Sequence, residues 1–289
     1  MKKLKDFISI LTELNKTRIT FVVTLTTLAG YVLANKHIDS NVILPMVGIF
    51  ILACGSAALN HYQDRDKDAL MERTKNRPLP SGRISERNVL LISAIEILAG
   101  TWIIYLGSNQ EAAILGFMAF IWYNGIYTPL KRVTAFAVIP GSVIGAIPPA
   151  VGWVAGGGAL LDIRLVVLTV FFFISQVPHF WLLMLKYGKE YEVAGFPSIT
   201  SVMTPVQIKR AIFIWTVSTA IIGALIVLSG LVITTFFKIM VFAAAAWLIA
   251  LFSRLLRKAY FDFNPFRYFM SINYFVLVLI IAMIVDPLM

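Results

Sequence analysis

Three oxygen-bearing side chains recur at four-residue spacing where an apolar segment gives way to a polar one. Asn60, Asp64 and Asp68 lie in the stretch that begins at Ala58. If the helix of the apolar segment continues through them, they share one face, because residues four apart are neighbours on a helix. Asp66 then points elsewhere. Mg²⁺ in proteins takes one or two carboxylates and completes its octahedron with water and phosphate oxygens. The spacing therefore predicts a magnesium site.

A cluster of basic residues follows directly, between residues 71 and 83. Guanidinium groups bind phosphate oxygens through two parallel hydrogen bonds. Prolines and a glycine break the helix here and fold the segment back as a loop. The cations are Arg73, Lys75, Arg77 and Arg83, and the breakers are Pro78, Pro80 and Gly82. Carboxylates for a metal followed by cations for phosphate predict a diphosphate site. The alternative is a solvated charged loop that serves only topology.

These residues sit among apolar segments that are long enough to cross a membrane. Hydrophobic residues make up 59% of the 289, whereas soluble domains average about 45–50%. Continuous apolar blocks of about 20 residues fit membrane-spanning helices better than barrel strands. We predict an all-α integral membrane protein, a single domain over 1–289, with about nine transmembrane helices in one bundle. The predicted spans are 19–35, 42–60, 89–106, 112–129, 134–156, 163–185, 211–231, 234–253 and 268–286.

The basic residues are distributed unequally between the two sides of this bundle. Nine spans place every lysine and arginine except Lys36, Arg164 and Lys238 on the side of the N-terminus. Such an excess is typical of cytoplasmic loops. The N-terminus is therefore predicted inside and the C-terminus outside, with the protein in the cell's inner (plasma) membrane. The net charge of +10 is then mainly a topology signal, and no nucleic-acid partner is expected.

Two long polar loops are predicted on the cytoplasmic side, at about 61–88 and 186–210. Loops longer than a simple connection requires are often functional. The second loop carries Glu190 and Glu192, which we interpret as a second acidic site. His179 lies near the inner end of its span, where a polar side chain requires a partner or a wet cavity. Together these features predict a bundle around a cavity that faces the cytoplasm.

The sequence resembles the UbiA-type intramembrane prenyltransferase superfamily and, within it, the protoheme IX farnesyltransferases (heme O synthases). Residues 60–83 resemble the long first motif of the superfamily. The segments 145–153 (Gly-Ala-Ile-Pro-Pro-Ala-Val-Gly-Trp) and 176–181 (Gln-Val-Pro-His-Phe-Trp) are similar to heme O synthase segments. Shorter matches begin at Lys16, Tyr127 and Tyr191. The last three spans match only in hydropathy.

The resemblance has three departures. Ala137 stands where the family usually has Asn, and Lys189-Glu190 stands where it usually has Asp-Asp. Ser198-Ile-Thr replaces a frequent Met-Leu-Pro. These positions lie at the second acidic site and near the expected acceptor pocket. An aromatic quinone precursor therefore stays an alternative acceptor.

The resemblance implies transfer of a farnesyl group from farnesyl diphosphate to a vinyl group of protoheme IX (heme B). The products are heme O and diphosphate, and the cofactor is Mg²⁺. It implies a catalytic role for Asn60, Asp64, Asp68 and Glu190, all four also metal ligands, with Glu192 as a further ligand. The candidates for substrate binding are Arg18, Arg73, Arg77, Lys131, Arg132, Tyr127 and His179.

Several alternatives stay open. His179 is either a heme contact, as axial ligand or propionate partner, or a hydrogen-bonded histidine at a helix end after Pro178. A heme-handling partner protein is a further expectation beside the two substrates and the lipid bilayer. A membrane transporter is the remaining function, since many spans with a few polar residues suit one. Against it, the charged residues gather in loops and not along a path across the bilayer.

Overall fold

The structure, a computed structural model, describes residues 2–257 and 264–289, with side chains from residue 5 onward. Every regular element within these ranges is helical, which confirms the predicted all-α class. The longer helices are α1 (Lys2–Leu14), α2 (Thr17–Asn35), α3 (Ile43–Asp68), α4 (Glu86–Gly107), α5 (Gln110–Phe120), α8 (Val143–Ala155), α9 (Ile163–Val193), α11 (Pro205–Leu228), α12 (Thr235–Arg257) and α13 (Pro265–Val285). The short ones are η1 (Ser40–Val42), η2 (Ile121–Tyr127), α6 (Thr128–Leu130), η3 (Ala135–Ala137), α7 (Val138–Gly141), α10 (Ile199–Val202) and η5 (Asp286–Leu288).

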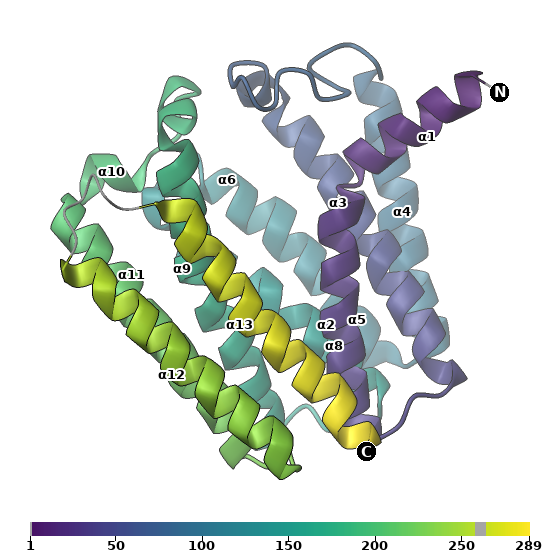
Figure 1. The fold of residues 1–289 in the computed structure, drawn as a ribbon. Helices are drawn as coiled ribbons and strands as arrows, with labels where there is room; N and C mark the ends of the chain where they lie inside the picture. Colours follow the sequence, from purple (N-terminus) through teal and green to yellow (C-terminus); the bar gives the residue numbers. More distant parts are fainter. Residues whose placement is uncertain (1, 258–263) are drawn as a thin grey trace.

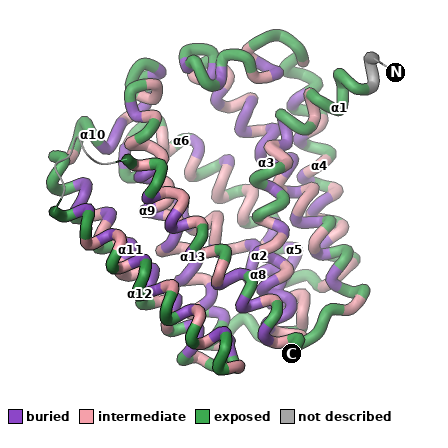
Figure 2. The backbone as a smooth tube through the Cα atoms, viewed as in Figure 1, coloured by how far each residue is buried: buried purple, intermediate pink, exposed green. Residues whose placement is uncertain are grey.

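Nine stretches within the described ranges are long and apolar enough to span a membrane, as predicted. Figure 2 shows exposed residues along these helices, and many of the exposed residues are large and apolar. Leu98, Trp102 and Phe236 are 67%, 59% and 70% exposed. Lipid tails cover such surface, whereas water would make it an aggregation site. The chain is therefore a multi-pass membrane protein, and Figure 1 shows the start of α1 and the C-terminus at opposite ends of its bundle.

The fourth and fifth spans are not continuous α-helices. α5 passes into the π-helical segment η2 and then α6, and the fifth span is assembled from η3, α7 and α8. Pro129 and Pro140 lie at these breaks, and proline has no amide hydrogen to continue the helical bonding. The π-helical segment brings the side chain of Asn124 to α3, where its Nδ2 donates a 3.0 Å hydrogen bond to the carbonyl of Ser56. The break therefore fixes the fourth span against the helix that carries the acidic residues.

Two helices continue beyond their predicted membrane boundaries, and their extensions lie at the same end of the bundle (Figure 1). α3 runs to Asp68, and α9 runs to Val193. The prediction of a loop from residue 186 was therefore wrong, and both Glu190 and Glu192 are helical. No proline interrupts the extension of α9, which ends just before Gly195 with its left-handed φ of +71°. Glycine is the usual residue at such a helix end.

α2 and α8 pack with their backbones in contact at two glycines. A Cβ added to Gly152 would lie 1.9 Å from the carbonyl oxygen of Thr27. One added to Gly30 would lie 2.0 Å from the carbonyl oxygen of Pro149. Small residues allow membrane helices to approach in this way. The first span is thereby held against the middle of the bundle.

Gly152→Ala is expected to destabilise the protein by about 1–3 kcal/mol, because the new methyl group forces two backbones apart. The measurement is the thermal unfolding midpoint of the purified protein in detergent. Gly125→Ala is the control, since the nearest atom to its added Cβ is 3.9 Å away. Equal midpoints for the two variants would contradict this account of the α2–α8 contact.

Candidate active site

The face of α3 that was predicted to bind a metal is formed and buried. The side chains of Asn60, Asp64 and Asp68 come from one continuous helix, and these residues are 4%, 5% and 2% exposed. Asn60 Nδ2 donates hydrogen bonds to Asp64 Oδ2 at 2.9 Å and to Thr128 Oγ1 at 3.2 Å. The helical continuation on which the prediction depended is therefore confirmed.

Cations from other elements pair with both carboxylates of this face. Lys131 Nζ contacts Asp64 Oδ2, and Arg132 Nη2 lies 3.5 Å from the other oxygen of Asp64. Arg77 Nη1 lies 2.7 Å from Asp68 Oδ2. A buried carboxylate without such partners is strongly destabilising. The structure thus brings three of the predicted phosphate-binding cations to the two aspartates.

Lys16 belongs to this cluster, although the basic residue predicted to bind substrate at the start of the first span was Arg18. Lys16 Nζ donates a 2.9 Å hydrogen bond to Asn60 Oδ1. Its left-handed backbone (φ 46°, ψ 45°) makes the turn between α1 and α2, and side chains other than glycine's rarely adopt it. Loss of water contact, with the nearby charges of Arg77 and Lys131, lowers the pKa of Lys16 to about 7. Arg18 is exposed and borders a hollow on the surface of the protein that neither buried aspartate lines.

Of the four cations in the loop between α3 and α4, Arg77 contacts a buried aspartate, Asp68. Lys75 Nζ pairs with Glu72 at 2.7 Å, and Arg83 pairs with Glu13 of α1. The side chain of Arg73 lies over the ring of Tyr187, 5.0 Å from its centroid. Several charges of the loop therefore pair near its surface, as expected for a solvated charged loop. One guanidinium group, that of Arg77, reaches the buried site.

Glu190 and Glu192, predicted as one acidic site, point to different partners. Glu190 Oε2 accepts a 3.2 Å hydrogen bond from the backbone N–H of Arg73, so it meets the loop over the site. Glu192 is exposed and accepts a 2.8 Å hydrogen bond from Thr200 Oγ1. Residues two positions apart on a helix are separated by about 200° of rotation, so these two side chains point in different directions.

The loop between α3 and α4 contacts α3, the segment that follows α9, and α1. Thr74 Oγ1 donates a 2.8 Å hydrogen bond to the carbonyl of Asp68. Met71 packs with Ala194 and Phe196, beyond the end of α9. The Glu13–Arg83 pair fastens the far end of the loop to α1, and Arg83 lowers the pKa of Glu13.

A small pH-dependent contribution to stability follows from the Glu13–Arg83 pair. Since the pKa of Glu13 is below its usual 4.5 in the folded protein, the stabilisation is complete above that pH and is lost as the pH falls through the folded value. Glu13→Gln should lower the thermal midpoint by about 1–2 °C at pH 7, because exposed ion pairs contribute little. The difference from wild type should shrink as the pH falls below 4.5 and vanish once Glu13 is protonated in the folded protein. A difference that persists there would exclude the ion pair as its cause.

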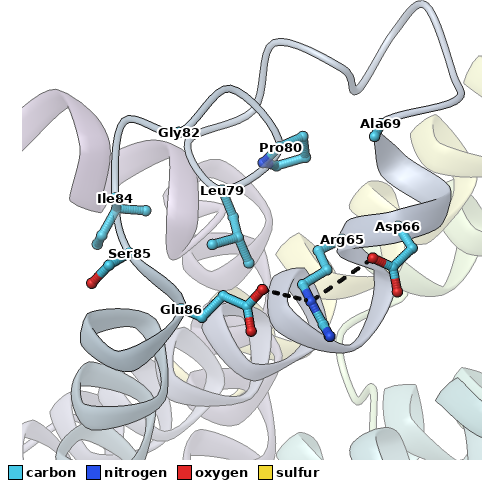
Figure 3. A pocket seen from close by; sticks show the side chains of 9 residues that line it. All are labelled: Arg65, Asp66, Ala69, Leu79, Pro80, Gly82, Ile84, Ser85 and Glu86. Carbon is cyan, nitrogen blue, oxygen red and sulfur yellow. Dashed lines mark hydrogen bonds and ion pairs between the residues drawn. The ribbon is translucent and has the colours of Figure 1, made fainter.

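A surface pocket lies beside the same loop but apart from the buried aspartates (Figure 3). Arg65 lines it, with its Nε 3.0 Å from Glu86 and 3.9 Å from Asp66. Neither Asp64 nor Asp68 is among its lining residues. Asp66 therefore points away from the face that carries Asn60, Asp64 and Asp68, as predicted, and its side chain is 83% exposed.

Aromatic rings extend from the charged cluster along the fourth span and α9. Tyr127 stacks on Tyr123 with 5.9 Å between ring centroids, and its ring lies 6.5 Å from that of Phe180. Lys131 Nζ is 5.8 Å from the centroid of Tyr127. A Cβ on Gly141 would lie 2.4 Å from the ring of Tyr127, so the glycine provides the room for it. Aromatic faces stabilise a nearby cation.

His179 lies inside α9, so the helix end that one of the two alternatives placed after Pro178 is absent, whereas the hydrogen bond that it supposed is present. α9 accommodates Pro178 and continues. The Nδ1 atom of His179 is 2.8 Å from Oδ1 of Asn273 on α13. Its ring lies 4.5 Å from that of Phe269 and 5.4 Å from that of Phe180. The last span thus contributes directly to this region, which sequence reasoning missed because the contact joins residues 94 positions apart.

The donor atoms on α3 suit a magnesium ion. Two carboxylates and one amide oxygen lie on one helix face, and Mg²⁺ fills its remaining positions with water and phosphate oxygens. Within the described ranges no three His, Cys, Asp or Glu side chains gather closely enough to hold a metal by themselves. Glu190 and Glu192 are therefore not joined with the aspartates into one ligand set. The residues that fit are Asn60, Asp64 and Asp68.

Buried aspartates that pair with cations from other elements, at one end of a membrane bundle, fit an integral membrane enzyme that acts on a phosphorylated substrate. The sequence model of the UbiA prenyltransferase family matches residues 23–282. The chain therefore belongs to the UbiA prenyltransferase family.

The curated relatives carry the name of one particular activity within this family. A protoheme IX farnesyltransferase of Oleidesulfovibrio alaskensis is 30% identical over 94% of both chains. One of Geobacter sulfurreducens is 40% identical over 60% of this chain and 63% of its own length. One of Legionella pneumophila is 35% identical over 74% of this chain and 73% of its own.

Solved structures share the fold at low sequence identity. A digeranylgeranylglyceryl phosphate synthase superposes with a TM-score of 0.80 at 17% identity, covering 100% of this chain and 99% of the other. A UbiA homologue from Archaeoglobus fulgidus, bound to DMAPP and Mg²⁺, superposes with a TM-score of 0.74 at 14% identity, covering 96% and 98%. These likenesses establish the common architecture.

Proposed function

We propose that this protein transfers the farnesyl group of farnesyl diphosphate to a vinyl group of protoheme IX, giving heme O and diphosphate. The observation that carries the proposal is the buried α3 face, with Asp64 and Asp68 paired to Lys131, Arg132 and Arg77. It is the arrangement that a diphosphate and its metal require. The acceptor rests on the relatives named protoheme IX farnesyltransferase, one of which aligns over 94% of this chain.

In this proposal the donor's diphosphate binds among the cations that now pair with the aspartates. Asn60, Asp64 and Asp68 would hold Mg²⁺, which supplies positive charge to the leaving diphosphate when bound. Arg77 and Lys131 add fixed charge at the same place, and Lys16 adds a further positive charge when it is protonated. Fixed charges around a leaving group stabilise it without reorganisation during the reaction.

Aromatic residues act on the farnesyl group, at the carbon where the bond breaks. The C1–O bond of the donor breaks, and its electron pair leaves with the diphosphate. Tyr127 and Tyr123 shield the allylic cation from water and face it with their rings. The vinyl group then forms the new C–C bond, and a water molecule adds at the resulting cation and loses a proton. The product carries a hydroxyl group beside the new farnesyl chain.

The distribution of charge orients this reaction in the membrane. We place the end of the bundle with the α3–α4 loop in the cytoplasm, where an excess of lysine and arginine is typical. The compartment would be the inner (plasma) membrane. A partner protein that delivers or receives heme fits a substrate that is poorly soluble in water.

The proposal is tested with purified protein, farnesyl diphosphate, Mg²⁺ and heme B together with an aromatic quinone precursor as a competing acceptor. The expected results are diphosphate release and a product with the mass of heme O. A prenylated quinone precursor as the sole product would replace the acceptor and keep the reaction class. Flux of solute through liposomes without diphosphate release would favour the transporter and overturn the proposal.

A further inference from the structure

The hydrogen bond between His179 and Asn273 defines which ring nitrogen of the histidine is available. Nδ1 of His179 lies 2.8 Å from the amide oxygen of Asn273. An amide oxygen only accepts hydrogen bonds, so Nδ1 carries the proton. The neutral ring then has its lone pair on Nε2. A histidine whose Nδ1–H is fixed by an oxygen is the usual arrangement of a metal ligand that binds through Nε2.

The Nε2 atom of His179 is free to take a ligand. It has no hydrogen-bond partner in the part of the chain that the structure describes, and it is not one of the buried polar atoms that lack a partner there. His179 is partly exposed. A ring nitrogen with an accessible lone pair inside a membrane span is costly unless it serves a purpose.

The rings around His179 lead to the charged cluster on α3. Phe180 lies 5.4 Å from His179 and 6.5 Å from Tyr127. Tyr127 in turn lies 5.8 Å from the ammonium group of Lys131, which contacts Asp64. The imidazole therefore stands at one end of an aromatic wall whose other end is the proposed diphosphate site. A flat apolar acceptor along this wall would meet the farnesyl cation beside Tyr127.

We propose that Nε2 of His179 binds the iron of the heme acceptor and that Asn273 is the positioning residue that fixes the ring for it. This rests on the proposed function, in which the acceptor is heme B. It assigns a role to α13, outside the segments whose motifs resemble the family. Ligation of the iron holds the macrocycle in one orientation and so selects which vinyl group faces the donor.

The experiment is a titration of the purified full-length protein with heme B, followed by absorption and by the iron–histidine stretching band of the ferrous complex. His179→Gly should lose that band and bind heme at least about tenfold more weakly, and added imidazole should restore the band. Asn273→Leu should weaken binding about 10–100-fold, as loss of such supporting hydrogen bonds does. Asn273→Asp keeps an accepting oxygen and should retain binding. Ser271→Ala, two residues away on α13 with its hydroxyl bonded to Arg267, is the unaffected control.

The outcomes separate this inference from the proposed function. An unchanged iron–histidine band and unchanged affinity in His179→Gly, in a protein that still converts heme B, would overturn the inference and leave the function intact. Wild-type protein that prenylates only another acceptor would overturn both. If His179→Gly does not fold, the contrast between Asn273→Leu and Asn273→Asp decides, and equal affinities in these two variants would overturn the inference.

Discussion

Asp64→Asn is expected to lower the rate of diphosphate release from farnesyl diphosphate about a thousandfold, the upper range for losing one preorganised electrostatic group. Asp64 is 5% exposed and is contacted by Lys131, Arg132 and Asn60. The substitution removes a proposed metal ligand and also the negative charge that holds two cations in place. The rate is measured under saturating donor and heme B, so that weakened binding does not account for the loss.

Asp66→Asn is the matched control for this experiment. It lies on the same helix two residues further on, and its side chain is 83% exposed beside the pocket of Figure 3. We expect its rate to stay within about twofold of wild type, as for surface changes away from a site. A rate for Asp64→Asn above one tenth of wild type, or an equal loss in Asp66→Asn, would contradict the account.

A folding defect is separated by a second variant. Removing Asp64 alone leaves Lys131 partly buried without its counter-ion, which destabilises folded proteins. Asp64→Asn combined with Lys131→Met removes both charges, so it should recover the thermal midpoint toward wild type while the reaction stays lost. Recovery of both midpoint and rate would show that the aspartate serves only to neutralise the lysine.

Lys16→Met is expected to lower kcat/KM for farnesyl diphosphate about a hundredfold, at the lower end for one lost electrostatic contact. Methionine keeps most of the length of the lysine side chain and removes the ammonium group that lies 2.9 Å from Asn60 Oδ1. The effect arises because one positive charge no longer faces the diphosphate. Steady-state kinetics with varied donor concentration provide the measurement.

Arg18→Met is the control for Lys16, since both are basic and they stand two positions apart at the start of the first span. Arg18 is exposed on the outer surface, so its loss should change kcat/KM less than about threefold, as is usual for surface substitutions. If Arg18→Met were the more damaging of the two, the sequence assignment would be right and the cluster built around Lys16 would be wrong.

The sequence predicted the elements whose signals are local. The four-residue spacing of Asn60, Asp64 and Asp68 required only that one helix continue, and α3 does continue to Asp68. The nine spans followed from apolar length, because hydrocarbon thickness sets it directly. The direction of Asp66 followed from helical rotation alone.

The parts that were missed depend on turns and on contacts between distant segments. Lys16, and not Arg18, lies at the site, where the backbone of residue 16 is left-handed. A lysine in the sequence does not indicate that conformation. Glu190 and Glu192 diverge because α9 is helical where a loop was expected. The pairing of His179 with Asn273 joins the sixth and ninth spans, and nothing local to either residue encodes it.

The central claim is that the α3 face holds the metal and the diphosphate of the donor. The most direct measurement is the anomalous scattering of Mn²⁺, used in place of Mg²⁺, in crystals of the protein with a non-hydrolysable farnesyl thiodiphosphate. The account predicts a peak about 2.1 Å from carboxylate oxygens of Asp64 or Asp68, with the diphosphate against Lys16, Arg77 and Lys131. A metal and diphosphate bound elsewhere, with Asp64 and Asp68 still paired to their cations, would contradict it.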